Sequence, residues 1–379
     1  MTLIQRIKQI RLNGMITLYR LLPLRKNRII CWANSFKQYG CSPKYITERL
    51  LKDHPGRYDI VWAFEDGVQV PEELRDRVRI VRYFSQAYLR ELHTAKFVIC
   101  NMRTGAAHLW KKRTGQIYIQ TWHSSLRLKK IEADAAERLP DAYIRQAKAD
   151  SKRIDLLLSG CRFSTDIFRR AFWYDGPILE SGTPRCDVLL EEGPGMREKV
   201  YRHFRIPEGS RLALYAPTFR SGRGSDFLGM DFTGLKGMLE ADGSPWTVGA
   251  RLHPNVLHGA DPDGAVAMST YPDMQELLAA ADLLITDYSS CMFDMAIARK
   301  PCVLYAPDLD EYVAKERGLY FHLEDLPFPL ARTMDELQEA IQGFDRERYL
   351  EKVDAFLEKI GSFEDGNAAR RVCEFICQQ

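Results

Sequence analysis

The chain has 379 residues, of which 45% are hydrophobic and 28% are charged, and this ordinary globular usage excludes disordered and fibrous proteins. Because single hydrophobic cores stop growing below this length, two domains are expected. The formal net charge of +3 is too small to indicate nucleic-acid binding, and we expect no nucleic acid as a partner.

The amino-terminal segment combines basic and apolar residues and contains no acidic one. Its basic residues are Arg6, Lys8, Arg11, Arg20, Arg25, Lys26 and Arg28. A basic amphipathic helix of this kind can lie on an anionic bilayer, where each basic residue contributes about 1 kcal/mol. The alternative is a helix packed on the protein's own core, and the sequence leaves both open. No segment is apolar enough over eighteen residues to span a membrane, and the arginines interrupt any secretory signal.

The cysteines are scattered and show no spacing typical of a zinc site or a disulfide framework. There are nine of them, none in a CxxC pair, and several lie inside apolar runs. This pattern indicates reduced thiols in the core of a cytoplasmic protein.

Short apolar runs alternate with helical patterns over the first part of the chain. We expect buried strands at 28–33, 59–64, 78–81, 96–100 and 116–120. Strand and helix repeated in this order predict a parallel sheet covered by helices.

A second series of strands is expected from residue 155 onward. Its members are 155–159, 177–181, 212–218, 246–254, 282–287 and 301–307. Two such series predict an α/β fold with two Rossmann-like domains facing a central cleft, where ligands lie beyond the carboxyl ends of strands. The expected divisions are a basic segment 1–27, domains 28–180 and 181–360, and a closing helix 361–379. The glycine-rich stretch 221–234 is expected to be a mobile loop beside the cleft.

The stretch 282–305 carries the sharpest local feature. An apolar strand ends at Thr286 and Asp287, and Ser289 and Ser290 come directly before a predicted helix. A helix start offers unpaired N–H groups and the positive end of the helix dipole, which suits a phosphate. The alternative is that Asp287 or Ser289 only caps the helix.

Two histidines follow predicted strands, one in each half of the chain. His123 comes after the strand at 116–120 and precedes a basic turn with Lys129 and Lys130, and His253 follows Arg251. Imidazole titrates near neutral pH, which suits a general base. For any single histidine a hydrogen bond to nearby backbone is the more common role, but two beside cations in opposing domains favour a site.

These motifs together resemble the CDP-glycerol glycerophosphotransferase family, the primases and polymerases of teichoic acid synthesis. The matching elements are TWHSSLRLKK at 121–130, GTPRCD at 182–187, YAPTFR at 215–220, RLHPN at 251–255, TDYSSCMFD at 286–294 and DLDEYVAKERGLYF at 308–321. One departure is that many members have WHGTP where this chain has Trp122-His123-Ser124-Ser125-Leu126. The loop that borders the acceptor therefore differs.

The resemblance implies a GT-B-like fold, with the acceptor on the first domain and the CDP donor on the second. It implies His123 as the base and His253 as a contact of the donor pyrophosphate. Ser289, Ser290, Arg251 and Thr218 are then donor phosphate-binding residues. The implied supporting residues are Asp287, Asp294, Lys129, Lys130, Arg220 and Arg317. We assign the two aspartates to orienting the loop and expect neither metal nor cofactor.

The implied reaction transfers glycerol phosphate from CDP-glycerol to a hydroxyl of an undecaprenyl-diphosphate-linked saccharide or of a growing polymer, and releases CMP. It implies a peripheral enzyme at the cytoplasmic face of the cell membrane, with an anionic membrane surface as partner. The sequence leaves three alternatives open. They are a CDP-ribitol donor, a nucleotide-sugar glycosyltransferase of the same fold, and a binding module without activity.

Overall fold

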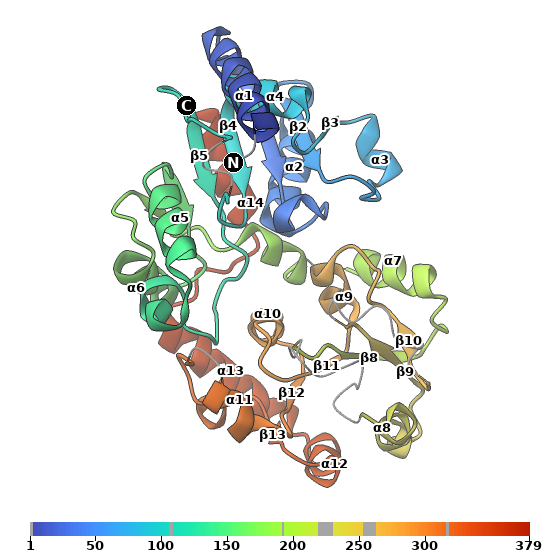
Figure 1. The fold of residues 1–379 in the computed structure, drawn as a ribbon. Coiled ribbons are helices and arrows are strands. Elements are labelled where there is room, and N and C mark those ends of the chain that lie inside the picture. The colour runs from blue at the N-terminus through green and yellow to red at the C-terminus, as the bar shows by residue number, and fades with distance from the viewer. Residues whose placement is uncertain (1–2, 106–108, 192, 219–229, 253–262, 316–317) are drawn as a thin grey trace.

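Two parallel β-sheets form the centres of two lobes (Figure 1). The structure is a computed structural model that describes all residues except 1–2, 106–108, 192, 219–229, 253–262 and 316–317. Within the described residues, the first sheet has the strand order β3-β2-β1-β4-β5-β6-β7 and the second β10-β9-β8-β11-β12-β13. In both sheets the first strand of the lobe lies in the middle, and the strand order along the sheet reverses at that strand. This is the order of a doubly wound nucleotide-binding fold. The predicted fold class is confirmed.

The first lobe contains the following elements: α1 (Leu3–Leu21), β1 (Arg25–Trp32), α2 (Cys41–Asp53), β2 (Asp59–Phe64), α3 (Glu72–Arg75), β3 (Arg79–Arg82), α4 (Gln86–Thr94), β4 (Ala95–Cys100), β5 (Ile117–Gln120), α5 (Asp141–Ser151), β6 (Leu156–Leu158), α6 (Arg162–Ala171) and β7 (Ile178–Leu179). The second contains α7 (Gly195–Phe204), β8 (Arg211–Tyr215), α8 (Phe232–Leu239), β9 (Trp246–Ala250), β10 (Val266–Ala267), α9 (Met274–Ala280), β11 (Leu283–Thr286), α10 (Cys291–Ile297), β12 (Cys302–Tyr305), α11 (Leu309–Lys315), β13 (Leu330–Ala331), α12 (Met334–Gln342) and α13 (Arg346–Ile360).

The first sheet is buried on both faces because its side chains alternate between two cores. Ile29 and Trp62 point to the face covered by α2 and by α14 (Ala368–Cys377), the last helix of the chain. Ile30 and Val61 point to the opposite face, where α4 and α6 pack. The strands therefore read as continuous apolar runs.

One part of the predicted strand series is wrong. The strands near 155–159 and 177–181 were expected to open the second series, but β6 hydrogen-bonds to β5 and β7 to β6, so both extend the first sheet. The second sheet begins with β8. Membership of a sheet depends on which strand edge a segment pairs with, and an apolar run alone does not carry that information.

Helix α1 packs on the core along one side, as one of the two alternatives predicts, and leaves apolar side chains exposed on another. Ile16 is fully buried, and Leu12 and Tyr19 pack on the first-lobe core beside α4. Ile10 and Leu21, by contrast, are 70% and 78% exposed. None of the described helices has the length and apolar character that crossing a bilayer requires.

Arg28 does not belong to the exposed basic segment in which we had placed it. Its guanidinium is buried and forms ion pairs with Asp59, at 2.7 Å, and with Glu91. A buried arginine that is already paired contributes little to attraction by an anionic surface, so the basic surface of this segment ends before it.

The chain crosses between the lobes twice, and both crossings lie together. The first crossing, residues 181–187, leaves the first lobe, and the second crossing, residues 361–367, returns from α13 to α14 (Figure 1). Asp187 accepts hydrogen bonds from the N–H groups of Ala368 and Ala369 at 3.0 and 2.8 Å. The first turn of α14 is thus capped by the other crossing.

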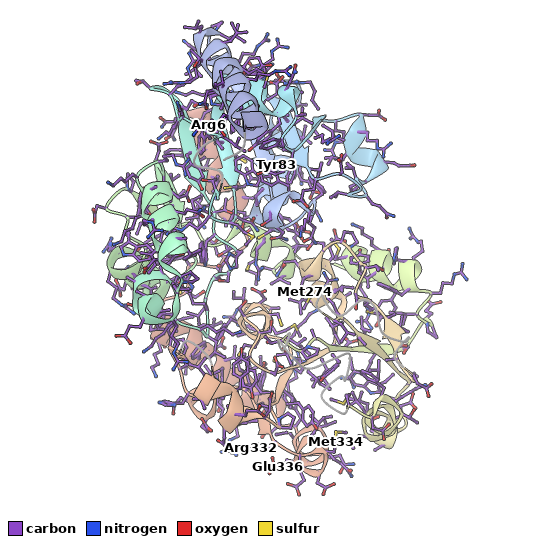
Figure 2. The ribbon with its side chains drawn as sticks, viewed as in Figure 1. Arg6, Tyr83, Met274, Arg332, Met334 and Glu336 are labelled. Atoms are coloured by element: carbon purple, nitrogen blue, oxygen red, sulfur yellow. The ribbon has the colours of Figure 1, made fainter. Side chains whose placement is uncertain are left out.

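A buried ion cluster also joins the lobes at α2 and α9. Lys44 on α2 contacts Asp273 and Glu276, both at 2.6 Å, and Met274 at the start of α9 lies on the side of the second lobe nearest the first (Figure 2). Tyr45 donates to Asp273 at 2.9 Å.

Candidate functional site

His123 lies at the carboxyl end of β5, in the loop of residues 121–130, which we call the base loop. Its Nδ1 lies 3.3 Å from the carbonyl oxygen of Asn101, the residue that follows β4. A carbonyl only accepts, so this contact assigns the proton to Nδ1 and the ring lone pair to Nε2. Neutral His123 therefore presents a basic nitrogen on the side away from Asn101.

A strained backbone residue orients His123. Trp122 has a φ of +53°, an unusual value for a bulky residue. Its ring is buried against Phe168 and Phe172, and its N–H donates to the Gln120 side chain at 2.9 Å. Packing and this hydrogen bond together fix the turn that carries the imidazole.

Asn101 is itself fixed by a left-handed turn after β1. Its side-chain oxygen accepts from the Asn34 N–H at 2.9 Å, and its Nδ2 donates to the Asn34 side chain at 2.7 Å. Asn34, Ser35 and Phe36 all have positive φ, between 46° and 69°. Asn101 is fully buried, so this reciprocal pair fixes the carbonyl that contacts His123. Neither asparagine was predicted from the sequence, although Asn101 directly follows a predicted strand.

The base loop meets the second lobe directly. The Lys130 N–H donates to the Gly318 carbonyl at 3.0 Å, and the Tyr320 N–H donates to Leu128 at 2.7 Å. Gly318 has a φ of +81°, and the Lys130 side chain lies 3.2 Å from where its Cβ would be. The basic turn is therefore a contact between the lobes.

A stack of side chains connects the base loop to residues 286–290, the last residue of β11 and the loop that follows it, which we call the serine loop. Lys129 Nζ lies 5.1 Å from the centre of the Tyr312 ring. Tyr312 stacks on Tyr288 at 3.6 Å with the rings nearly parallel. The structure thus brings together two of the predicted motifs, which are more than 150 residues apart in the chain.

Asp287 and Thr218 lie together at the carboxyl ends of β11 and β8. The buried Asp287 carboxylate accepts from the Thr218 N–H at 2.8 and 3.0 Å, and also from the Tyr288 N–H at 2.5 Å. These contacts link two adjacent loops of the second lobe, and the role of Asp287 in orienting a loop stays a prediction.

Ser289 and Ser290 precede α10, as the sequence predicts. Ser290 is its N-cap residue, its side chain makes no capping hydrogen bond, and both serines are partly exposed. Ser289 makes a long contact of the kind that the capping alternative predicts, because the Cys291 N–H lies 3.5 Å from Ser289 Oγ.

Asp294 is buried and Arg251 is half-buried, and both are held by neighbouring segments. Asp294 pairs with Arg185 and accepts from Gln275 at 2.8 Å, which fixes α10 to the first crossing and to α9. Arg251 donates to the Tyr271 carbonyl at 2.7 Å. Burial lowers its pKa, while the nearby Asp273 and Cys291 oppose that shift. Asp294 therefore supports α10, and Arg251 supports the segment between β10 and α9.

Three predicted site residues, His253, Arg220 and Arg317, lie outside the described residues. So does most of the stretch 221–234. Among the residues that the structure describes, there is no group of three or more His, Cys, Asp or Glu side chains arranged to bind a metal ion. All nine cysteines are free, and eight of them are buried.

A family model described as CDP-Glycerol:Poly(glycerophosphate) glycerophosphotransferase matches residues 14–378. The chain belongs to this family. It is 34% identical over 361 residues to a teichoic acid poly(glycerol phosphate) polymerase of Staphylococcus epidermidis, covering 90% of this chain and 49% of that protein. It is 30% identical to a teichoic acid glycerol-phosphate transferase of Staphylococcus aureus, with 98% of each covered.

Solved structures agree with this membership. The wall teichoic acid polymerase TagF superposes with a TM-score of 0.86 at 31% identity, over 99% of this chain and 95% of that one. A UDP-N-acetylglucosamine 2-epimerase from Listeria monocytogenes shares the fold, with a TM-score of 0.55 at 14% identity. The chain spans about half the length of the first two curated relatives, 49% of each, and nearly all of the Staphylococcus aureus transferase.

Proposed function

We propose that the protein transfers glycerol phosphate from CDP-glycerol to a hydroxyl of a membrane-linked saccharide or of a teichoic-acid-type polymer, and releases CMP. The observation that carries the proposal is the contact of the base loop with the serine loop through Lys129, Tyr312 and Tyr288. This contact joins a positioned imidazole on one lobe to a candidate phosphate site on the other.

The proposed reaction is a single displacement at the distal phosphorus of the donor. The acceptor hydroxyl gives its proton to His123 Nε2 while its oxygen forms a bond to that phosphorus. The bond from the phosphorus to the bridging oxygen breaks, and CMP leaves with that oxygen. A positioned general base of this kind contributes about 10²–10⁴-fold.

The donor diphosphate is proposed to lie at the serine loop, where Ser289, Ser290 and the N–H groups that start α10 face it. Lys129, Lys130 and Arg251 would supply positive charge around the loop, and preorganised charge of this kind stabilises a leaving phosphate. His253, Arg220 and Arg317 complete the proposed set from the family motifs. We propose that no metal ion is needed, and unchanged turnover in EDTA is the expected result.

Glycerol is proposed as the polyol because the relatives named for glycerol phosphate are 30–34% identical, whereas those named for ribitol phosphate are 24–28% identical. One similar TagF structure is of a histidine-to-asparagine variant soaked with CDPG, which supports the same donor.

The acceptor is proposed to be undecaprenyl-diphosphate-linked or polymeric and to be met at the cytoplasmic face of the membrane. Support comes from α1, where Ile10, Leu18 and Leu21 are 60–78% exposed beside the exposed Arg11 and Arg20. Changing these three apolar residues to serine should lower partitioning onto anionic vesicles. Deleting residues 2–24 would also uncover the core that Ile16 fills, so the triple variant is the cleaner test. Unchanged partitioning of the triple variant would contradict the proposal.

The decisive experiment supplies purified protein and an acceptor with CDP-glycerol, CDP-ribitol or a UDP-sugar. The expected result is CMP release that is fastest with CDP-glycerol. Faster release with CDP-ribitol would change the polyol. UDP release alone would make the protein a glycosyltransferase, and binding of CDP-glycerol without any release would make it a binding module.

A further inference from the structure

A carboxylate lies where the two crossings between the lobes meet. Glu364, on the second crossing, accepts a hydrogen bond from the Thr183 N–H of the first crossing at 2.9 Å. The neighbouring Phe363 N–H donates to the Gly160 carbonyl at 2.9 Å. Glu364 thus connects the entry into the second lobe with the exit from it.

Two glycines make room for the Glu364 carboxylate. A Cβ at Gly160 would lie 2.5 Å from both Glu364 Oε1 and Thr183 Oγ1, and closer still to the Ser125 hydroxyl. A Cβ at Gly182 would lie 3.0 Å from Glu364 Oε2. Only residues without a side chain allow this convergence of polar groups.

Ser125 brings the base loop into the same cluster. It is two residues after His123 and nearly fully buried, and its hydroxyl lies against the Glu364 carboxylate. Its carbonyl accepts from the Ser164 hydroxyl of α6 at 2.6 Å. The loop that carries His123 therefore bonds to α6 on one side and lies against the Glu364 carboxylate on the other.

We propose that Glu364 is a positioning residue that fixes the base loop to both crossings, so that the arrangement of the lobes sets the position of His123. This role rests on the proposed transferase function for its effect on turnover. Its effect on the base loop itself does not depend on that function.

The surroundings of Glu364 give it an unusual protonation behaviour. Burial raises the pKa of Glu364 to about 7, and the nearby Asp187 also raises it, while hydrogen bonding from Ser125 and Thr183 opposes the shift. Cys161, Cys186 and the Arg162 side chain also lie around this junction. Near neutral pH the carboxyl group can therefore change its protonation state beside the Ser125 hydroxyl.

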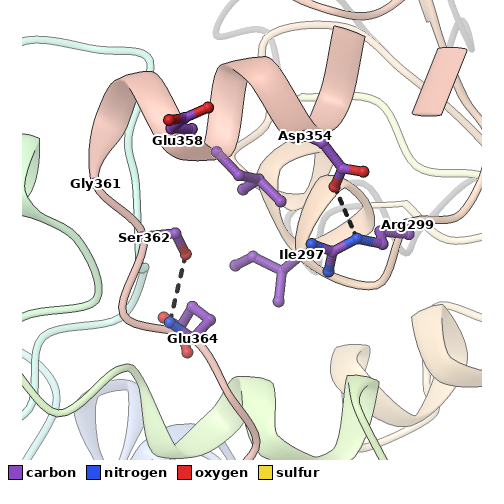
Figure 3. A pocket seen from close by; sticks show the side chains of 8 residues that line it. Ile297, Arg299, Asp354, Glu358, Gly361, Ser362 and Glu364 are labelled. Atoms are coloured by element: carbon purple, nitrogen blue, oxygen red, sulfur yellow. Dashed lines mark hydrogen bonds and ion pairs between the residues drawn. The ribbon is translucent and has the colours of Figure 1, made fainter. Parts of the chain in front are cut away.

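A cavity of about 460 Å³ opens beside this junction (Figure 3). It is lined by Ile297, Arg299, Asp354, Leu357, Glu358, Gly361, Ser362 and Glu364. Arg299 is paired with Asp354 at 2.8 Å, so it does not neutralise Glu364. The exposed Glu358 lines the same cavity from α13 and offers a matched control.

The first test compares Glu364→Ala, Glu364→Gln and Glu358→Ala by hydrogen exchange of the full chain. We expect faster exchange of the amides at 122–128 in Glu364→Ala, and wild-type exchange in Glu358→Ala. Glu364→Gln keeps an oxygen for the Thr183 N–H and gains a donor for Ser125, so it should protect the loop nearly as well as wild type. Unchanged exchange at 122–128 in Glu364→Ala would overturn the proposal.

The second test measures CMP release by the same variants. Because a group displaced by about 1 Å can lose up to about 100-fold in rate, kcat of Glu364→Ala should fall by about tenfold or more while the KM for CDP-glycerol stays within about twofold. Glu364→Gln should restore kcat, and its pH profile should keep the inflection from the base His123 while losing the further one near pH 7 that comes from Glu364. A rise in KM alone would overturn the positioning role.

Failure of the proposed transferase function can be distinguished from failure of the proposed role of Glu364. If the wild type releases no CMP, the proposed function fails, and the exchange experiment still decides the role of Glu364. If Glu364→Ala does not fold, Ser125→Ala removes the other side of the contact and should give the same faster exchange. Slow exchange in that variant would contradict the proposal.

Discussion

The carboxyl edges of the two sheets fix their functional residues by different means. At the first edge, the groups nearest to His123 are neutral: the Asn101 carbonyl and, behind it, the Gln120 and Asn34 side chains. At the second edge, the loops around α10 are fixed by buried charges, with Asp287 on backbone N–H groups and Asp294 on Arg185.

The difference follows from what each edge is proposed to bind. A base must gain and release a proton, and a fixed charge beside it would bias that equilibrium. A diphosphate is an anion throughout the reaction, so rigid loops supported by ion pairs suit it. Substitutions at the first edge are therefore expected to act mainly on turnover, and substitutions at the second edge mainly on stability.

The largest effect is expected from His123→Ala at the first edge. Loss of the base should lower kcat by about 10²–10⁴-fold and leave CDP-glycerol affinity within about twofold, since the imidazole acts on the acceptor. CMP release and calorimetric binding measure the two quantities. His322→Ala removes an exposed histidine and is the control. Turnover close to wild type in His123→Ala would remove His123 from the mechanism.

At the second edge, Arg185→Met should destabilise the fold. It leaves the buried Asp294 without its cation, and breaking a buried pair in this way costs about 3–5 kcal/mol, measured as the free energy of unfolding in urea. Arg299→Met removes a partner from an exposed pair, 52% and 53% accessible, and should cost less than about 1 kcal/mol. Equal losses of unfolding free energy in the two variants would mean that burial does not determine the cost of breaking these ion pairs.

Between the two lobes, the Lys44 cluster should make the free energy of unfolding depend on pH in the acidic range. Burial raises the pKa of Glu276, but Lys44 and hydrogen bonds from Lys199 and Tyr271 lower it overall, to about 2. Because this folded-state pKa lies below the ordinary value, Glu276 stabilises the fold above about pH 4.5, and the contribution, about 3 kcal/mol, is lost as the pH falls toward 2.

Lys44→Met should therefore flatten the dependence of unfolding free energy on pH between about 2 and 4.5. Lys52→Met, on the exposed side of the same helix, should leave this dependence unchanged. An unaltered slope in Lys44→Met would show that Lys44 does not set the ionisation of Glu276.

The smallest effect is expected from Asn34→Ala. It leaves the buried Asn101 amide without its side-chain partner, which costs about 1–3 kcal/mol, and it frees the carbonyl that orients His123. Turnover should fall more than donor affinity. The exposed Asn27→Ala serves as the control, and identical kinetics of the two variants would separate Asn34 from the base loop.

The sequence predicts most strands because each is a buried apolar run, and β2 matches its predicted bounds, 59–64. Strands β10 and β13 have two residues each, too few for any periodicity to show. The pairing of β6 with β5 was missed because strand pairing joins distant segments.

In the candidate site too, local sequence predicts some residues, whereas contacts between distant segments could not be predicted. His123, Asp287 and the serines were found because each follows a strand or precedes a helix. Asn34 was missed because three successive residues with positive φ have no sequence signature without glycine. Glu364 was missed because its partner Ser125 is more than 200 residues away in the chain.

The position of α14 has a consequence for biosynthesis. Val372, Cys373 and Ile376 fill the core beneath α2 in the first lobe, yet the ribosome makes them after every strand of the second lobe. Amino-terminal domains generally fold first during synthesis. Here the emerging first lobe has an uncovered apolar face until translation has passed through the other lobe, which makes it a candidate client for chaperones during that interval.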